Sequence, residues 1–341
     1  MSNKIKIADT DVEFTIADRD TILRAALRDG IPISYECNSG GCGSCKIDVV
    51  EGQVETLWGE APGLSPRDKR KSRKLACQCL ASGPVTIKAQ LTDNKLPEIR
   101  PSRRQVQYVG RRDLTSDMAE FSFQAEEPAL FLPGQYAMLT VPGIEGDRAY
   151  SMSNVSNDSG RWQFIIKRMP GGKASNWLFD ELKPGGMIEI DGPFGLAYLH
   201  PEIQRDVVCI AGGSGLSPVM SIVRAITGDP RFSERKVHLF YGGRTPQDLC
   251  TSELLSEIEP LNTKAKVICK TAVSDHQSAE KEKWEGPCCY IHELAEQTLG
   301  DHMMEFEYYF CGPPPLTEAV QRMLMIDHKV PFDRIHFDRF F

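Results

Sequence analysis

Four cysteines in the first hundred residues are spaced to hold a small iron–sulfur centre. Cys37, Cys42 and Cys45 form a C-x4-C-x2-C run, and Cys77 follows about thirty residues later. This spacing is typical of the four thiolate ligands of a [2Fe–2S] cluster, which carries one electron at a time. The glycines and serines between the ligands let backbone N–H groups approach the sulfurs. We therefore predict a [2Fe–2S] cluster in this part of the chain.

Two alternatives concern the same cysteines. A structural zinc site usually combines two C-x2-C pairs, and this chain has one such pair, so the spacing favours the cluster. Cys79 lies two residues after Cys77 and competes for the fourth ligand position. The sequence LACQ around Cys77 looks like the LxCQ stretch of plant-type ferredoxins, so we favour Cys77 and expect Cys79 to be a buried sulfur.

Two later motifs have the groups that a flavin dinucleotide needs. Residues 148–151 (RAYS) supply a guanidinium for pyrophosphate, a flat ring for the isoalloxazine and a hydroxyl for the reactive N5. Residues 171–178 (GGKASNWL) form a glycine-rich turn that opens a helix, where free N–H groups bind phosphate. Either motif alone has an ordinary explanation, a chance match or a capped turn. Together they indicate a flavin site.

Two further motifs lie at the ends of apolar strands. Residues 211–218 (AGGSGLSP) stand between a buried strand and a helix, where a dinucleotide pyrophosphate binds. They do not match GxGxxG, and a tight turn also uses glycine. Residues 311–316 (CGPPPL) place a thiol and rigid backbone at the same edge of the sheet, although a strand terminator would look similar.

The elements that carry these motifs divide the chain into three domains. Residues 1–96 alternate in short strands around one capped helix, and 97–103 form a proline-rich polar linker. Evenly spaced strands over 104–202 predict an antiparallel barrel. Continuous apolar strands that alternate with helices over 203–341 predict a doubly wound parallel sheet.

Composition narrows the possible functions. The chain has 341 residues and a net charge of −7, which argues against general nucleic-acid binding. It shows no signal-peptide core and no apolar run long enough for a membrane span, so we expect a cytoplasmic protein without membrane contact. Eleven cysteines, four of them in the cluster pattern, agree with a reducing compartment.

The order and identity of these motifs resemble the NADH-dependent reductase components of bacterial multicomponent oxygenases, such as those of phenol, toluene, methane and benzoate oxygenases. The resemblance covers nearly the whole chain and includes two more stretches, 240–245 (FYGGRT) and 271–275 (TAVSD). It implies a plant-type ferredoxin domain of β-grasp fold, then an FAD-binding barrel and an NAD-binding domain like those of ferredoxin–NADP⁺ reductase.

The resemblance also implies roles for individual residues. Arg148 would bind the FAD pyrophosphate, Tyr150 would lie against the flavin and Ser151 would lie near N5. The flavin site would be completed by Lys167 and a turn made of Gly172, Lys173, Ala174 and Ser175. The nicotinamide dinucleotide would contact Gly213, Ser214, Gly215 and Gly312, with the thiol of Cys311 beside the nicotinamide.

The chain ends in aromatic residues, and in related reductases a terminal ring covers the flavin until nicotinamide displaces it. Phe341 is the candidate for that role; the alternative is that the terminal rings only pack against the last strand. Asp338 is the candidate for an acidic residue that assists the site in relatives, where Glu is commoner. Asp248 is a candidate ribose ligand that would repel a 2′-phosphate and favour NADH, whereas Arg244 would favour NADPH.

The predicted enzyme is an NADH-dependent flavin iron–sulfur oxidoreductase. It would move a hydride from NADH to FAD and single electrons through the cluster to a terminal oxygenase, or its ferredoxin, that attacks aromatic or other hydrocarbons. The basic residues 67–74 form either a solvated face or a surface that steers an acidic partner. The resemblance suggests a monomer. Two alternatives stay open, a reductase for a deoxysugar-biosynthesis dehydratase and a redox sensor without catalysis.

Overall fold

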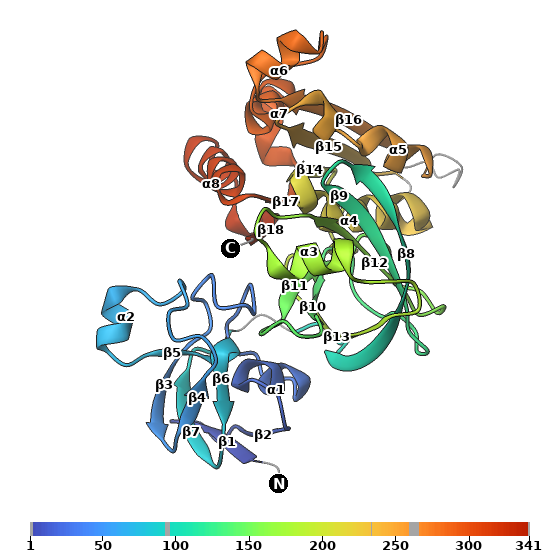
Figure 1. Ribbon diagram of the computed structural model, residues 1–341. Coiled ribbons are helices and arrows are strands. Elements are labelled where there is room, and N and C mark those ends of the chain that lie inside the picture. Colours follow the sequence, from blue (N-terminus) through green and yellow to red (C-terminus); the bar gives the residue numbers. More distant parts are fainter. Residues whose placement is uncertain (1–2, 93–95, 233, 259–265, 340–341) are drawn as a thin grey trace.

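The computed structural model describes residues 3–92, 96–232, 234–258 and 266–339. These residues form three successive domains, each built around one sheet of five or six strands (Figure 1). The first two sheets each have one apolar core, and the third has one on each face. A few barrel residues also belong to the cores of the neighbouring domains. Within the described residues, no helix combines the length and apolar character needed to cross a membrane.

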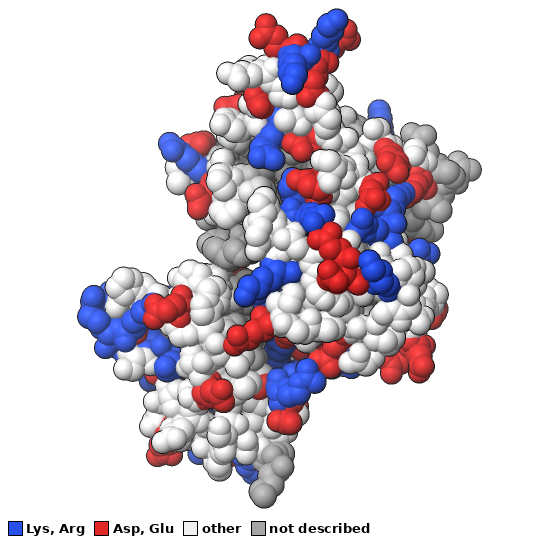
Figure 2. Space-filling model, in the orientation of Figure 1, with Lys and Arg blue, Asp and Glu red and all other residues white. Residues whose placement is uncertain are grey.

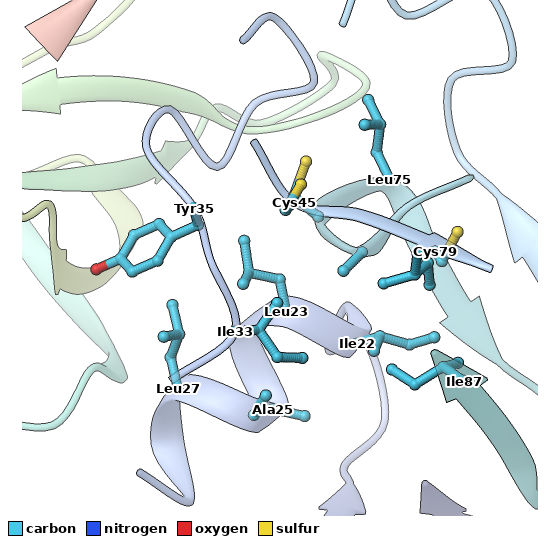
Figure 3. Close-up of a cluster of buried hydrophobic side chains, with 14 of the residues drawn as sticks. Ile22, Leu23, Ala25, Leu27, Ile33, Tyr35, Cys45, Leu75, Cys79 and Ile87 are labelled. Atoms are coloured by element: carbon cyan, nitrogen blue, oxygen red, sulfur yellow. The ribbon is translucent and has the colours of Figure 1, made fainter. Parts of the chain in front are cut away.

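The first sheet has the strand order β2-β1-β7-β3-β5. Its strands are β1 (Asn3–Ile7), β2 (Glu13–Ile16), β3 (Lys46–Glu51), β5 (Lys74–Leu75) and β7 (Val85–Ala89); β4 (Val54–Thr56) pairs with β6 (Cys79–Ala81). Helix α1 (Ile22–Arg28) begins where the Thr21 side chain accepts the N–H of Arg24, and its apolar face fills the core (Figure 3). The core between α1 and the sheet supports the loop that carries Cys37, Cys42 and Cys45.

The second sheet is antiparallel, in the order β11-β10-β13-β8-β9-β12. Its strands are β8 (Ser102–Thr115), β9 (Met118–Gln124), β10 (Tyr136–Thr140), β11 (Arg148–Ser151), β12 (Arg161–Lys167) and β13 (Met187–Phe194). A bridge between Met152 and Phe164 joins the two edge strands, so the sheet closes on itself as the predicted barrel. Helix α3 (Lys173–Asp180) follows β12.

The third sheet is parallel, in the order β16-β15-β14-β17-β18. Its strands are β14 (Val207–Gly212), β15 (Lys236–Gly243), β16 (Lys266–Val273), β17 (Glu307–Gly312) and β18 (Ile335–Arg339). Helices α4 (Leu216–Gly228) and α5 (Thr251–Ser256) pack on one face; α7 (Ile291–Leu299) and α8 (Pro314–Arg322) pack on the other. This is the predicted doubly wound arrangement, with α6 (His276–Lys281) after β16.

Some elements differ from the expectation. β8 begins at Ser102, inside the predicted linker, and runs for 14 residues. The basic segment contains a short helix, α2 (Pro66–Arg70), which begins in a capping box between Ser65 and Asp68. A capping residue followed by proline was a readable signal for this helix, but the segment was interpreted only by its charge, as a solvated face or a partner surface.

Candidate active site and cluster site

The four predicted cluster ligands lie together as two pairs. The thiols of Cys37 and Cys42 are hydrogen-bonded to each other, and so are those of Cys45 and Cys77. The hydrogen bond lowers the pKa of one thiol in each pair, Cys37 and Cys45, although burial opposes this. No group of three His, Cys, Asp or Glu side chains within the described residues is arranged to hold a metal ion. Two sulfur pairs are what a two-iron cluster requires, one pair for each iron.

Backbone N–H groups converge on these sulfurs. The N–H groups of Ser39 and Cys42 donate to Sγ of Cys37 at 3.5 and 3.3 Å. Gly43 has a φ of +78°, and a Cβ there would lie 2.4 Å from a carbonyl oxygen, so the close wrapping requires glycine. Asn38 is buried, and its amide nitrogen and oxygen have no hydrogen-bond partner among the described residues. The sulfurs of a bound cluster would accept a hydrogen bond from the amide nitrogen, so this loop fits the predicted group.

Cys79 is fully buried in the core of the first domain, and burial raises the pKa of its thiol to about 11. Figure 3 shows its side chain apart from that of Cys45. Cys77, in contrast, is the residue paired with Cys45. The geometry therefore supports Cys77 over Cys79 as the fourth ligand.

The RAYS motif forms strand β11, which pairs with β10 in the barrel. Ser151 is 2% exposed, and its Oγ has no partner among the described residues. A buried hydroxyl without a partner costs about 1–3 kcal/mol unless a ligand satisfies it, so Ser151 fits the role beside flavin N5. Tyr150 is half-buried, and burial raises its pKa to about 12, which keeps the phenol neutral. Arg148 is exposed and donates to carbonyls of its own loop, including that of Gly146 at 3.0 Å.

The glycine-rich turn opens α3, as predicted. Gly172 occupies the N-cap position, and Lys173 and Ala174 begin the helix. The Oγ of Ser175 accepts the N–H of Met169 at 3.1 Å, which folds the turn back on itself. A Cβ on Gly172 would lie 2.7 Å from that Oγ, so glycine is needed for this turn.

Lys167 ends the barrel strand β12, between the two flavin motifs. Its Nζ lies 3.0 Å from a carboxylate oxygen of Asp117. Its Cδ is the nearest heavy atom to a Cβ built on Gly213, at 3.8 Å. Lys167 therefore lies where the barrel meets the nucleotide-binding turn of the third domain.

The two nucleotide motifs meet at the carboxyl edge of the parallel sheet. Ala211 of β14 pairs with Cys311 of β17. Gly215 lies directly on this junction, because a Cβ there would be only 2.1 Å from the carbonyl oxygen of Cys311. Gly213 has a φ of +55°, and Ser214 lies with it in a 3-10 turn before α4. Gly312 ends β17 beside this turn.

Cys311 is buried, and burial raises the pKa of its thiol well above the usual value. It pairs with Asp338 of β18 in the parallel ladder. Burial raises the pKa of Asp338 to about 7, with further contributions from Glu36 and Cys37 of the cluster loop. The charges of Glu36 and Cys37 are near enough to affect the pKa of Asp338, so the cluster loop lies near this edge of the sheet.

Sequence reasoning missed Ser217 and Ser221, which fasten α4 to the barrel. Ser217 donates to the carbonyl of Ser151 at 2.6 Å and accepts the N–H of Ile165 at 2.9 Å. Ser221 donates to the carbonyl of Asn154 at 2.6 Å. Their four-residue spacing puts both hydroxyls on one face of α4, which was a weak sequence signal. These bonds hold the nucleotide turn against the flavin strand.

The predicted roles of Asp248, Arg244 and Phe341 are not visible in the structure. The Oδ2 of Asp248 accepts the N–H groups of Arg244 and Thr245 at 2.9 and 3.0 Å, so this oxygen caps a turn; a ribose contact stays a prediction. Arg244 is exposed at the same turn. Phe341 lies outside the described residues, so its predicted flavin-covering role has no structural description.

The chain matches three family models in the predicted order. Residues 5–82 match the 2Fe-2S iron-sulfur cluster binding domain, residues 105–198 the oxidoreductase FAD-binding domain, and residues 209–322 the oxidoreductase NAD-binding domain. The cofactors of the chain are therefore a [2Fe–2S] cluster, FAD and a nicotinamide dinucleotide. When bound, FAD accepts hydride and the cluster accepts single electrons.

Curated relatives align with nearly the whole chain. The chain is 40% identical over 329 residues to ferredoxin–NAD(P)⁺ reductase CarAd of Metapseudomonas resinovorans, with 96% of each chain covered. It is 35% identical over 335 residues to the ferredoxin–NAD⁺ reductase component of an alkene monooxygenase system of Xanthobacter autotrophicus, which covers 96% of this chain and 97% of the relative.

A solved ferredoxin reductase in carbazole 1,9a-dioxygenase superposes with a TM-score of 0.88 at 38% identity, covering 100% of this chain and 99% of that one. The cytochrome P450 reductase GcoB of Amycolatopsis has a TM-score of 0.82 at 26% identity, with coverages of 99% and 98%. These comparisons favour the oxygenase prediction over the deoxysugar and sensor alternatives. The chain belongs to the family of ferredoxin–NAD(P)⁺ reductases that serve as the reductase components of oxygenase systems.

Proposed function

We propose that this enzyme oxidises NADH and delivers single electrons to the terminal oxygenase, or an intermediary ferredoxin, of a mono- or dioxygenase that attacks aromatic or other hydrocarbons. The observation that carries the proposal is the proximity of the three sites. The carbonyl of Ser151 in the flavin strand accepts a hydrogen bond from α4, and Cys311 lies against the nucleotide turn. Tyr136, which lies opposite Ser151, donates to the carbonyl of Glu36, the residue before Cys37.

Each residue in this proposal acts by placement. Ser151, whose buried hydroxyl has no partner among the described residues, would hold the flavin near N5, and Tyr150 would support the ring. Arg148, which now donates to carbonyls of its own loop, would bind the pyrophosphate. Cys311, kept as a neutral thiol by burial, offers an uncharged surface to the nicotinamide. Hydride transfer between stacked rings needs alignment more than an acid or a base, so this rigid setting suffices.

NADH is the proposed electron donor rather than NADPH. Asp248 follows the second strand of the parallel sheet, where a carboxylate binds the ribose 2′-hydroxyl and repels a 2′-phosphate. Arg244 is the residue that would oppose this preference. One anaerobic titration of the protein, followed by flavin and cluster absorbance, tests both the function and the donor. NADH should bleach both chromophores and deliver about three electrons, two for FAD and one for the cluster. Bleaching by NADPH alone would overturn the choice, and no bleaching by either would overturn the function.

The proposed partner-docking face lies on the outer side of the cluster loop. Trp58 is 46% exposed and lies over the loop, because its ring is the nearest neighbour of a Cβ built on Gly40. Helix α2 lies near Trp58 in the fold, because its Lys69 pairs with Glu60. The exposed cations of α2 and of its C-cap residue, Lys71, form the blue patch over α2 in Figure 2. Arg67, Arg70 and Lys71 have no carboxylate within ion-pair distance among the described residues. An apolar centre with a basic rim fits an acidic redox partner.

Neutralising Arg67, Arg70 and Lys71 to glutamine tests this face. The second-order rate of partner reduction should fall at low salt and lose most of its salt dependence, because steering by charge raises the encounter rate. Lys6→Gln, an exposed cation on β1, is the matched control and should leave both unchanged. An unaltered salt profile in the triple variant would mean that α2 does not guide the partner.

A further inference from the structure

A group of buried charges lies between α1 of the ferredoxin domain and the barrel. Arg24 is 7% exposed in its side chain and lies 2.5 Å from Asp147 and 3.4 Å from Asp191. Arg28 donates two hydrogen bonds to Asp191, at 2.9 and 2.8 Å. The Asp191 side chain is 0% exposed. Solvent therefore does not screen these ion pairs as it screens pairs on the surface.

The charges in this group balance. Arg103 of β8 lies 2.6 Å from Asp20 and 3.7 Å from Asp191, which brings the total to three arginines and three carboxylates. Burial raises the pKa of Asp147, but the charge and hydrogen bond of Arg24 outweigh it and hold that pKa below its usual range. Removing one partner from such a group leaves a buried charge without compensation, which is far more costly than losing a surface pair.

Two tyrosines fix the chain that leads into the cluster loop. Tyr136 of β10 donates its hydroxyl to the carbonyl of Glu36 at 2.5 Å. From the ferredoxin side, the hydroxyl of Tyr35 accepts the N–H of Gly195 at 3.1 Å. Figure 3 shows the Tyr35 ring extending out of the ferredoxin core. Both rings are buried, and Glu36 directly precedes Cys37, so the peptide at the first cluster ligand is held against the barrel.

The same tyrosine belongs to the flavin strand pair. Tyr136 lies opposite Ser151 in the β10–β11 ladder, so one cross-strand pair and one hydrogen bond connect the proposed flavin contact to the peptide before Cys37. Met138 of β10 and Phe194 of β13 also belong to the apolar core of the ferredoxin domain. The interface is thus a continuation of that core, bordered by buried ion pairs.

We propose that Asp191 and Tyr136 are positioning residues for electron transfer from the flavin to the cluster, an inference that rests on the proposed function. Asp191 locks the ferredoxin domain on the barrel through Arg24 and Arg28, and Tyr136 sets the peptide next to Cys37. The ferredoxin domain then stays docked during turnover, which keeps the donor and acceptor at a constant separation. A partner must consequently reach the cluster from the outer face, beside α2.

Asp191→Asn and Tyr136→Phe test the proposal, with Glu13→Gln as the matched control. Glu13 lies on β2 of the ferredoxin domain and pairs with Lys4 at 3.4 Å, and the two side chains are 49% and 71% exposed. An exposed pair contributes little, so this variant should behave as the parent protein. The holoenzyme of each variant is followed by stopped-flow absorbance at flavin and cluster wavelengths. Cleavage of the oxidised protein by glutamyl endopeptidase after Glu98, the exposed glutamate of the linker, serves as a readout that needs no turnover.

We expect Asp191→Asn to slow flavin-to-cluster transfer and to speed linker cleavage, each by about tenfold or more. Tyr136→Phe should slow transfer by about fivefold while its cluster spectrum and its NADH-to-flavin step stay within about twofold of the parent. Transfer and cleavage at parental rates in both variants would overturn the proposal. Equal slowing of the NADH-to-flavin step would also overturn it, by showing a general effect on the barrel. Failure of the parent protein to oxidise NADH would refute the proposed function, while the cleavage result would still decide the docking.

Discussion

Gly215→Ala is the substitution whose effect on nicotinamide binding follows most directly from the geometry. A Cβ at Gly215 would lie 2.1 Å from the carbonyl oxygen of Cys311 and 2.7 Å from the N atom of Gly312. Both neighbours are backbone atoms inside a parallel ladder, so they cannot rotate away. The nucleotide turn itself must move outward.

The size of that movement sets the expected loss. An ordinary carbon–oxygen contact is about 3.3 Å, so the turn must shift by about 1.2 Å. A misplacement of about 1 Å in a positioning element lowers rate by about 100-fold, equivalent to about 2.7 kcal/mol in activation free energy. We therefore expect kcat/KM for NADH to fall about 100-fold in Gly215→Ala, while FAD content and reduction by dithionite stay normal.

Gly228→Ala is the control for this experiment. It adds the same methyl group to the last residue of α4, where no heavy atom lies within 4 Å of the new Cβ. The assay is anaerobic single-turnover flavin reduction over a range of NADH concentrations, with ferricyanide reduction as a steady-state check. If Gly215→Ala retained kcat/KM within about threefold of Gly228→Ala, the assigned contact between the nucleotide turn and Cys311 would be wrong.

Three further predictions concern the remaining contacts. Ser217→Ala should destabilise the protein by about 2 kcal/mol in thermal unfolding, because the buried N–H of Ile165 loses its acceptor. Glu120→Gln should destabilise by about 3 kcal/mol near pH 7, since Glu120 pairs with Arg224 at 2.9 Å in a buried site. Burial alone would raise the pKa of Glu120, but the charge and hydrogen bond of Arg224 outweigh burial and lower that pKa in the folded protein. The carboxylate therefore stabilises the fold fully above about pH 4.3, the pKa of an unfolded Glu. This stabilisation is lost as pH falls through the lower pKa that Glu120 has in the folded protein. Cys79→Ala should keep the visible and EPR spectra of the cluster.

Each of these predictions has a contradicting result. Parental stability in Ser217→Ala would show that the bond to α4 is dispensable. A stability difference between Glu120→Gln and the parent that persisted unchanged at pH 3 would show that charge on Glu120 is not its source. Loss of the cluster signal in Cys79→Ala, with retention in Cys77→Ala, would reverse the ligand assignment.

The features that the sequence predicted well are local ones. Three of the four cluster cysteines lie within nine residues, so their spacing indicated a cluster. The flavin and nucleotide motifs each occupy one turn or strand, and they indicated their cofactors only in combination and through the family resemblance. The alternation of apolar strands with helices likewise predicted the parallel sheet, because its strands β14 and β17 are buried on both faces. Each of these signals comes from neighbours in the chain.

The features that the sequence did not reveal are contacts between distant segments. Arg24 and Asp191 are 167 positions apart, and Ser217 and Ser151 are 66 apart. In sequence, Arg24 is an ordinary helix residue and Asp191 an ordinary strand end. Only the docking of α1 on the barrel buries both, so no local pattern distinguishes them from surface charges. The domain interfaces therefore had to come from the structure.

The most direct test of the account is the kinetics of reduction of the whole enzyme by NADH. In an anaerobic stopped-flow experiment, flavin absorbance should fall first, and cluster absorbance should follow in a phase whose rate does not depend on protein concentration. That order would show that electrons pass from nicotinamide to flavin to cluster within one docked chain. A cluster phase that accelerates in proportion to protein concentration would show transfer between molecules, and would contradict the account.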